Sequence, residues 1–362
     1  MPAQRALPLL FTLVLACGLA RSGLNQPPPS GRSVLTLGKP ARDVASGDVS
    51  SPMASVSGLA FSRDNGSLLV ARVWPARTPA MEAGHTEVIE VWKLSPLHLL
   101  RTMGSFGVYQ AELAPNGKLF ACLGARHIQL WDWQAGRMTA DIDVDAFRHD
   151  THTLEDFSAC FQTEPTFSFL SDSTLCYTGM KHKRLMRLDT ATGETQPTDL
   201  KFPENSAVTV SADGKMLCAA MYQESGFPDG LALYDVKSPA LIRTLPLDTA
   251  ALFGLLFFPD GKRLLTLEGD RCRVVDLATG KVLYSLPAHP DRSPAAISPN
   301  GRLLATVEKN SVSVWKAATG TKIAEWPSPS HATALAFAPD GRRLAIGYTD
   351  STIKLWTLPS LP

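Results

Sequence analysis

Short runs of alternating apolar and polar residues, separated by turn residues, recur along most of the chain. One unit starts at Ala295: AAIS alternates, Pro299-Asn300-Gly301 follows, RLLATVE is a second run, and SVSVW and KIAEW come after further turn residues. Alternation with period two predicts half-buried strands, and Asn-Gly between two runs predicts a hairpin. The unit therefore predicts four antiparallel strands of about five residues. No segment keeps a 3.6-residue period over three turns, so helix should be nearly absent.

The first two predicted strands recur as one phrase, in which apolar positions lead to Asp or Asn, then Gly, then Leu. Its seven copies are GLAFSRDNGSLL (58–69), AELAPNGKLF (111–120), FSFLSDSTLC (167–176), VTVSADGKML (208–217), LLFFPDGKRLL (255–265), AAISPNGRLL (295–304) and LAFAPDGRRLA (335–345). The markers Gly66, Gly117, Ser173, Gly214, Gly261, Gly301 and Gly341 are spaced by 51, 56, 41, 47, 40 and 40 residues. A period of roughly 40–45 residues with four strands per unit indicates a β-propeller.

The predicted third strands end in a second recurring pattern. It reads Trp131-Asp132 after HIQL, Tyr234-Asp235 after LAL, Val275-Asp276 after RCRV, Trp315 after SVSV and Trp356 after TIKL. This pattern resembles WD-repeat β-propellers over essentially residues 33–358. The resemblance implies structural roles for Trp131, Asp132, Asp235, Asp276, Trp315, His331, Asp350 and Trp356.

The chain also departs from the WD-repeat pattern in three ways. The Gly-His dipeptide is reduced to His289 and His331, and Trp is replaced in several repeats. The Asp of the turn before the third strand is clear only at Asp270 and Asp350. We therefore do not expect the family's network of His, Asp and Trp side chains in every repeat.

The ends of the chain predict how the ring closes. The last repeat stops after its third strand at Trp356, while residues 32–39 (RSVLTLGK) have the pattern of a fourth strand. Pairing this segment with TIKLW would close the ring and remove an exposed sheet edge. The expected fold is all-β, a single seven-bladed propeller of four-stranded antiparallel blades over residues 32–362, closed by an N-terminal strand.

Residues 1–20 have the layout of an export leader. Arg5 precedes the apolar stretch Leu7–Ala16, which is too short to cross a bilayer. Gly18-Leu19-Ala20 fits ordinary signal peptidase, and Val14-Leu15-Ala16-Cys17 fits a bacterial lipobox that would be lipidated at Cys17. We favour the lipobox because Cys17 directly follows the apolar stretch and residues 21–31 form a Pro-rich tether. Both sites predict export, to the periplasm or to a lipid anchor on the bacterial cell envelope.

The composition and charge of the chain argue against a disordered protein and against a nucleic-acid-binding protein. The 362 residues are 44% hydrophobic and 19% charged, which predicts a large folded core. Of 35 Lys+Arg and 34 Asp+Glu, the leader holds only Arg5, so 34 of each remain. This balance argues against nucleic acid as a partner. The five cysteines after the leader have irregular spacing and no CxxC pair, so we expect buried thiols rather than zinc sites or disulfides.

The longest predicted connections lie at residues 74–87, 141–161 and 222–230, and all should fall on the face opposite the tight turns. Long loops on a rigid scaffold are where binding residues concentrate. The alternative is that these loops are solvated insertions without a ligand. The candidate partner-binding residues are Trp74, His85, His149, His152, Glu155, Asp156, Lys181, His182, Arg184, Tyr222, Glu224, Phe227 and Asp229.

Two clusters among these candidates have an alternative chemistry. His149 and His152, with Glu155 and Asp156 nearby, could bind zinc or a hard cation, but the HExxH helix motif is absent and a polar loop is favoured. Residues 181–184 (KHKR) could meet an anion, although a solvated hairpin tip is favoured.

Catalytic motifs are absent from the sequence. It has no GxSxG elbow, no Walker loop and no GxGxxG leading into a helix. We therefore expect a monomeric, non-enzymatic protein–protein interaction scaffold that binds a protein or peptide, without cofactor or metal, and meets a membrane only through its lipid anchor. The alternatives are an envelope enzyme of the propeller lactonase or hydrolase kind, with a metal in the funnel, and a purely structural module.

Overall fold

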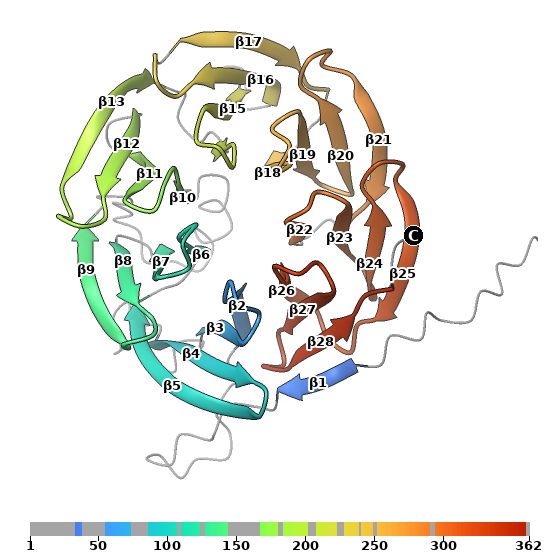
Figure 1. The fold of residues 1–362 in the computed structure, drawn as a ribbon. Helices are drawn as coiled ribbons and strands as arrows, with labels where there is room; N and C mark the ends of the chain where they lie inside the picture. The colour runs from blue at the N-terminus through green and yellow to red at the C-terminus, as the bar shows by residue number, and fades with distance from the viewer. Residues whose placement is uncertain are drawn as a thin grey trace, which may run out of the picture.

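All regular elements in the described part of the chain are β-strands. The computed structural model describes residues 33–37, 55–73, 86–106, 110–123, 127–143, 167–179, 184–201, 208–222, 228–238, 240–248, 252–289 and 294–359. They form seven sheets of four antiparallel strands, arranged as blades around a common centre (Figure 1). Within these residues there is no helix with the length and hydrophobicity needed to cross a membrane. The predicted seven-bladed propeller is confirmed.

Each blade is numbered here in chain order. Blade 1 contains β2 (Ser55–Phe61), β3 (Ser67–Val73), β4 (Thr86–Leu94) and β5 (Leu97–Phe106); blade 2 contains β6 (Gln110–Leu113), β7 (Leu119–Leu123), β8 (His127–Asp132) and β9 (Arg137–Asp143). Blade 3 contains β10 (Phe167–Phe169), β11 (Thr174–Gly179), β12 (Arg184–Asp189) and β13 (Thr195–Lys201); blade 4 contains β14 (Val208–Val210), β15 (Met216–Tyr222), β16 (Pro228–Asp235) and β17 (Leu241–Pro246).

The remaining blades complete the ring. Blade 5 contains β18 (Leu252–Phe257), β19 (Arg263–Glu268), β20 (Arg271–Asp276) and β21 (Val282–Pro287); blade 6 contains β22 (Ala295–Ile297), β23 (Leu303–Glu308), β24 (Ser311–Lys316) and β25 (Thr321–Pro327). Blade 7 contains β26 (Ala332–Phe337), β27 (Arg343–Tyr348), β28 (Ile353–Thr357) and β1 (Ser33–Leu37). The strands have three to ten residues, a wider range than the five expected.

The N-terminal strand closes the ring as the sequence predicted. β1 pairs antiparallel with β28, with Ser33 opposite Trp356 and Leu37 opposite Ile353. Blade 7 is therefore built from both ends of the chain, in the order β1-β28-β27-β26. This pairing gives the seventh blade the same four strands as the others.

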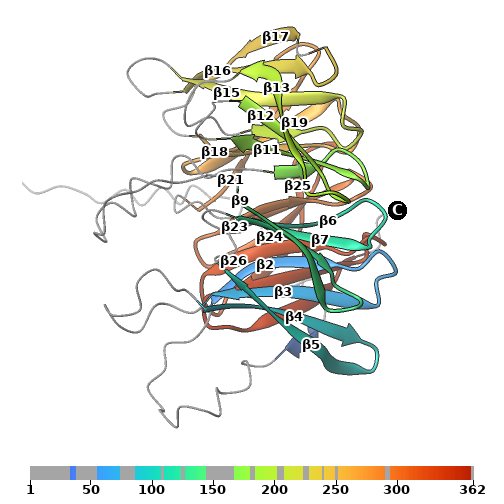
Figure 2. The ribbon, with the colours of Figure 1, turned by 90° about the vertical axis from the view of Figure 1, so that its left-hand side faces the viewer.

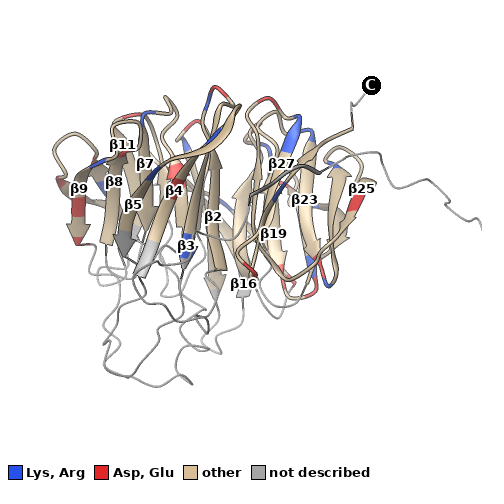
Figure 3. Ribbon diagram, turned by 90° about the horizontal axis from the view of Figure 1, so that it is seen from below, with Lys and Arg blue, Asp and Glu red and all other residues tan. Residues whose placement is uncertain are grey.

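The ring has two different faces because successive strands are antiparallel. Seen edge-on, the strands run between the faces (Figure 2). The turns between strands one and two and between strands three and four lie on one face, which we call the tight-turn face. The connections between strands two and three, and from blade to blade, lie on the other, which we call the wide-connection face. Acidic and basic residues are frequent on the tight turns (Figure 3).

In most blades, the turn between the first and second strands has one residue whose φ is positive, in the left-handed region. In blade 6 this is Gly301, with φ 66°, and its N–H donates to Ser298 O at 2.8 Å. The turn of blade 1 has the same length, but Asn65 (φ 60°) rather than the expected Gly66 takes the position, donating to Ser62 O at 2.9 Å. Asn tolerates this conformation better than most residues. The marker in the first repeat is therefore Asn65.

The hydrophobic core lies between neighbouring blades. One cluster joins blades 6 and 7 and includes Val314, Trp326, Ile346 and Tyr348, all buried. The second and third strands supply most of these side chains, since they are covered on both faces of the sheet. The predicted buried thiols are confirmed at Cys122, Cys176, Cys218 and Cys272, whereas Cys160 lies outside the described residues.

Candidate functional site

Most of the predicted partner-binding residues cannot be placed. Trp74, His85, His149, His152, Glu155, Asp156, Lys181, His182, Glu224 and Phe227 lie outside the described residues, as does the predicted lipidation site Cys17. What the structure does define is where their segments attach. Residues 74–85 follow β3, residues 144–166 follow β9, and residues 223–227 follow β15, so all three connect strand ends on the wide-connection face.

Three of the predicted binding residues belong to strands. Arg184 is the first residue of β12 and pairs with Gly179 of β11. Tyr222 is the last residue of β15, where it pairs with Pro228, and Asp229 is the second residue of β16. These positions place Arg184 in blade 3, and Tyr222 and Asp229 in blade 4, at the same face of the ring. Their part in binding stays a prediction.

The aspartates at the ends of the third strands stabilise the tight turns that follow. Asp132 Oδ1 accepts a hydrogen bond from the Ala135 amide at 2.9 Å, and Asp276 Oδ1 accepts from Thr279 N and Oγ1, both at 2.7 Å. The pKa of Asp276 is lowered chiefly by Thr279. The structural roles implied for these aspartates fit the turn geometry, which holds them as charged turn acceptors.

Two further aspartates show the same behaviour. Asp235 Oδ1 accepts from the Ser238 amide at 2.7 Å, and Asp189 Oδ1 accepts from the Ala191 and Thr192 amides, each at 2.9 Å. The recurring pattern found in the sequence did not include Asp189, although this residue ends the third strand of blade 3 in the segment RLMRLD. An Asp at that strand end, followed by Thr and Gly, was the signal that could have found it.

The tryptophans of the third strands differ from blade to blade. In blade 6, Trp315 Nε1 donates to Thr306 Oγ1 at 2.9 Å, and both side chains are buried. Thr306 lies on β23 two residues beyond Leu304, the residue paired with Trp315. In blade 7 the corresponding residue is Ile346, whose side chain has no acceptor, and Trp356 Nε1 has no hydrogen-bond partner among the described residues.

Trp131 in blade 2 resembles Trp356 in this respect. It pairs with Phe120, and the residue two positions further along β7 is Cys122. Within the part of the chain that the structure describes, the Trp131 indole N–H has no hydrogen-bond partner. The sequence had indicated that the His, Asp and Trp network cannot be assumed in every blade, and the tryptophans of blades 2 and 6 differ in this respect.

His331 and Asp350 hold the blade 6 to blade 7 connection together with His289. The His289 and His331 rings meet edge to face, with centroids 5.3 Å apart. The Thr349 amide donates to His331 O at 3.0 Å, while Asp350 Oδ1 accepts from Thr352 N and Oγ1 at 3.0 and 2.6 Å. These contacts agree with structural roles.

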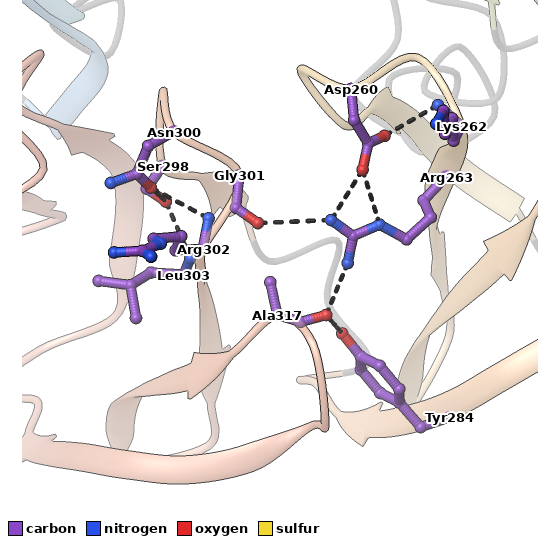
Figure 4. A network of polar contacts seen from close by, with 10 residues as sticks. All are labelled: Asp260, Lys262, Arg263, Tyr284, Ser298, Asn300, Gly301, Arg302, Leu303 and Ala317. Carbon is purple, nitrogen blue, oxygen red and sulfur yellow. Dashed lines mark hydrogen bonds and ion pairs between the residues drawn. The ribbon is translucent and has the colours of Figure 1, made fainter. Parts of the chain in front are cut away.

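An arginine joins the tight turns of blades 5 and 6 (Figure 4). Arg263 pairs with Asp260 at 2.9 Å, donates to Ala317 O at 2.8 Å and to Gly301 O at 3.5 Å, and lies over the Phe258 ring. The guanidinium group is planar and has several N–H donors, so it can make these contacts at the same time. Arg263 therefore ties two adjacent blades through backbone carbonyl groups.

The same device closes the ring between blades 7 and 1. Arg343, which follows its turn glycine by two residues as Arg263 does, donates to Asn65 O at 2.9 Å and lies over the Phe61 ring. The Asp340 amide also donates to Asn65 Oδ1 at 3.1 Å. Asn65 thus occupies the place that Gly301 has at the blade 5 to blade 6 seam. Neither arginine was identified from the sequence, since both act across blades.

These contacts show what the tight-turn face does. Many of its charged and polar groups are bound within turns or to the next blade, as Asp276, Arg263 and Arg343 are. In the described part of the chain no three His, Cys, Asp or Glu side chains are grouped to hold a metal ion. The candidate site for a partner is therefore the wide-connection face.

Comparison with known proteins agrees with this architecture. Residues 320–357 match the family model described as WD domain, G-beta repeat. The match runs from the fourth strand of blade 6 to the third strand of blade 7, so the sequence repeat is offset from the blade. No curated protein matches the chain. The matched repeat and the seven blades together support a WD-repeat propeller.

Proposed function

We propose that this WD-repeat propeller is a non-enzymatic interaction scaffold that binds a protein or peptide on its wide-connection face. The WD-repeat match is consistent with such a scaffold. The observation on which the proposal rests most is the difference between the two faces. Turn and inter-blade hydrogen bonds occupy the tight-turn face, whereas residues 74–85, 144–166 and 223–227 all attach to the other face.

The leader adds a location to this proposal. Residues 14–17 fit a lipobox, and the tether of residues 21–31 would separate an acyl chain at Cys17 from β1. The scaffold would then act outside the cytoplasm, in the periplasm or on the bacterial envelope. A Cys17→Ala variant should leave the membrane fraction if Cys17 is the anchor. Unchanged fractionation would contradict the lipid anchor but not the interaction site.

Cross-linked affinity capture in the native envelope fraction tests the binding face. The mature protein is compared with a variant whose three connections are shortened. Lys118→Ala combined with Lys262→Ala is the matched control, because both lysines are exposed on the tight-turn face. A partner that is kept by the control and lost by the shortened variant supports the proposal. A partner lost only by the lysine variant would move the site to the tight-turn face.

The enzymatic alternative depends on His149 and His152, which are close in sequence to two carboxylates. Metal analysis of the purified protein separates the two functions. A stoichiometric metal ion that is lost in the His149→Ala/His152→Ala variant would favour a metal-dependent enzyme. Absence of both metal and partner would favour a purely structural module.

A further inference from the structure

The seven described strands that line the centre of the ring carry almost no charge. The seven innermost strands are β2, β6, β10, β14, β18, β22 and β26, and their sequences are SVSGLAF, QAEL, FSF, VTV, LFGLLF, AAI and ATALAF. Glu112 in β6 is the one ionisable residue in these seven strands. The equivalent positions in the other blades are occupied by Ala60, Ser168, Thr209, Leu256, Ala296 and Ala336.

Glu112 lies where blades 2 and 3 meet at the centre. On β6, Gln110 Nε2 donates to Phe167 O at 2.8 Å, and the Phe167 amide donates to Gln110 Oε1 at 3.2 Å. Ser168 Oγ donates to Glu112 Oε1 at 3.4 Å. β6 and β10 lie side by side (Figure 1), and these side chains link them without a strand ladder.

Among the described residues, the strands next to Glu112 supply no countercharge. β2 and β10 contain no ionisable residue. On β11, burial and, to a smaller extent, the neighbouring Glu112 carboxyl group raise the pKa of the Cys176 thiol to about 12, so the thiol is neutral. Tyr177 on β11 is also uncharged at neutral pH. Arg187 on β12 is a cation that lowers the Cys176 pKa slightly, and its Nη2 donates to Val236 O at 3.0 Å, toward blade 4.

The remaining neighbour is β7, whose ionisable residue Cys122 packs in the core between blades 1 and 2. Within the described residues no ion pair includes Glu112. Burial at the centre raises the pKa of Glu112 to about 8, and this effect outweighs the hydrogen bonds from Ser168 and the Phe169 amide, which lower it. The carboxyl group is therefore mostly protonated at neutral pH.

We propose that Glu112 is a proton-binding site that sets how tightly blades 2 and 3 are joined at the centre of the ring. The neutral acid is compatible with its apolar surroundings, whereas the carboxylate of the half-buried Glu112 would be a charge without a partner cation among the described residues. Deprotonation therefore favours opening of the β6–β10 contact to water. Apart from the β2–β6 contact, which shares β6, the other five blade contacts have no ionisable group on their innermost strands and should not respond in this way.

The linkage has a defined sign. The pKa of Glu112 in the folded state, about 8, is above its ordinary value of 4.5. Between pH 4.5 and about pH 8, therefore, the folded state holds a proton on Glu112 that the unfolded state has released. The stabilisation is complete below about pH 4.5 and declines as pH rises to about 8. Over that range one proton corresponds to about a tenfold change in the unfolding equilibrium constant for each pH unit.

Hydrogen exchange of the full chain at about pH 6 and about pH 9, corrected for intrinsic rates, tests the proposal. Glu112→Gln keeps the shape of the side chain and is neutral at both values. Between these two pH values we expect amide protection in β6 and β10 to fall about a hundredfold more in the wild type than in the variant. Protection in β22 and β26 should be equal in the two proteins. Equal behaviour of β6 and β10 would overturn the proposal.

Ser168→Ala provides a second test if the Gln variant does not fold. It removes a hydrogen bond that favours the carboxylate, so the pH at which β6 and β10 lose protection should move upward. Carbon-13 NMR of the glutamate carboxyl groups gives a direct reading in the wild type. One carboxyl group should titrate far above the rest. The absence of such a group would also overturn the proposal.

Discussion

Arg72 and Glu90 form a buried ion pair at the seam between the first and last blades, with Arg72 Nε 2.9 Å from Glu90 Oε2. The Arg72 side chain is fully buried, and its Nη1 donates to Ser351 O of blade 7 at 2.6 Å. Trp92 Nε1 donates to the same Glu90 oxygen at 2.8 Å. One guanidinium group therefore links β3 and β4 to the β27–β28 connection, where the ring closes.

Removing the carboxylate should destabilise the protein strongly. Glu90→Ala leaves Arg72 as a buried charge without a counterion, which costs about 3–5 kcal/mol in the free energy of unfolding. Urea denaturation measures the loss. Arg271→Ala is the matched control, since the Arg271–Asp270 pair is exposed and should contribute at most about 1 kcal/mol. Similar losses in both variants would mean that Arg72 is hydrated in solution.

The hydrogen bond between Trp315 and Thr306 should contribute measurably. Thr306→Val keeps the shape of the side chain but leaves the buried indole N–H of Trp315 without an acceptor, at a cost of about 1–3 kcal/mol. Thr306→Ser keeps the hydroxyl and should lose less. Thermal unfolding compares the two. A larger loss for the Ser variant would show that packing of the methyl group, and not the hydrogen bond, dominates at this position.

Trp356 should contribute by packing alone. Its ring stacks on Trp326 with centroids 4.9 Å apart and joins the core between blades 6 and 7. Trp356→Ala should therefore cost about 3–5 kcal/mol. Trp356→Phe should recover most of this loss, because the indole N–H has no hydrogen-bond partner to lose. Equal losses for the Ala and Phe variants, measured by urea denaturation, would contradict a packing role.

The sequence predicted the blades because blade structure is local. Alternating residues and turn signals such as Pro299-Asn300-Gly301 determine which strands pair within one repeat. Contacts such as Arg72 with Ser351, or Arg343 with Asn65, join residues almost a full chain length apart. They depend on the relative placement of two blades, which no local pattern describes. The predicted binding residues in residues 74–85 and 144–166 remain predictions because they lie outside the described residues.

Turn glycines should differ in their tolerance of a side chain. Gly193 (φ 76°) has nothing within 4 Å of an added Cβ, so Gly193→Ala meets only the left-handed penalty of about 1–2 kcal/mol. At Gly214 (φ 67°) the added Cβ would lie 2.9 Å from Leu170 O, a backbone atom of blade 3. Gly214→Ala should therefore be clearly more destabilising in urea denaturation. Equal losses would show that blades 3 and 4 can separate at this turn.

Ring closure by β1 is the strongest stability prediction of the fold. Deleting residues 33–37 removes the outer strand of blade 7 and leaves the edge of β28 unpaired, which should lower the free energy of unfolding by several kcal/mol. A deletion of residues 1–32 is the control, because it retains β1 and should melt at the wild-type temperature.

A peptide of residues 32–39 provides a further test of closure. Added to the shortened protein, it should raise the melting temperature with increasing concentration, because it binds the folded ring and not the unfolded chain. The same peptide should leave the control deletion unchanged, since its β28 edge is already paired. Identical melts for the two deletions would show that blade 7 is stable with three strands. Closure would then depend on side-chain contacts between blades 7 and 1, such as Arg343 with Asn65.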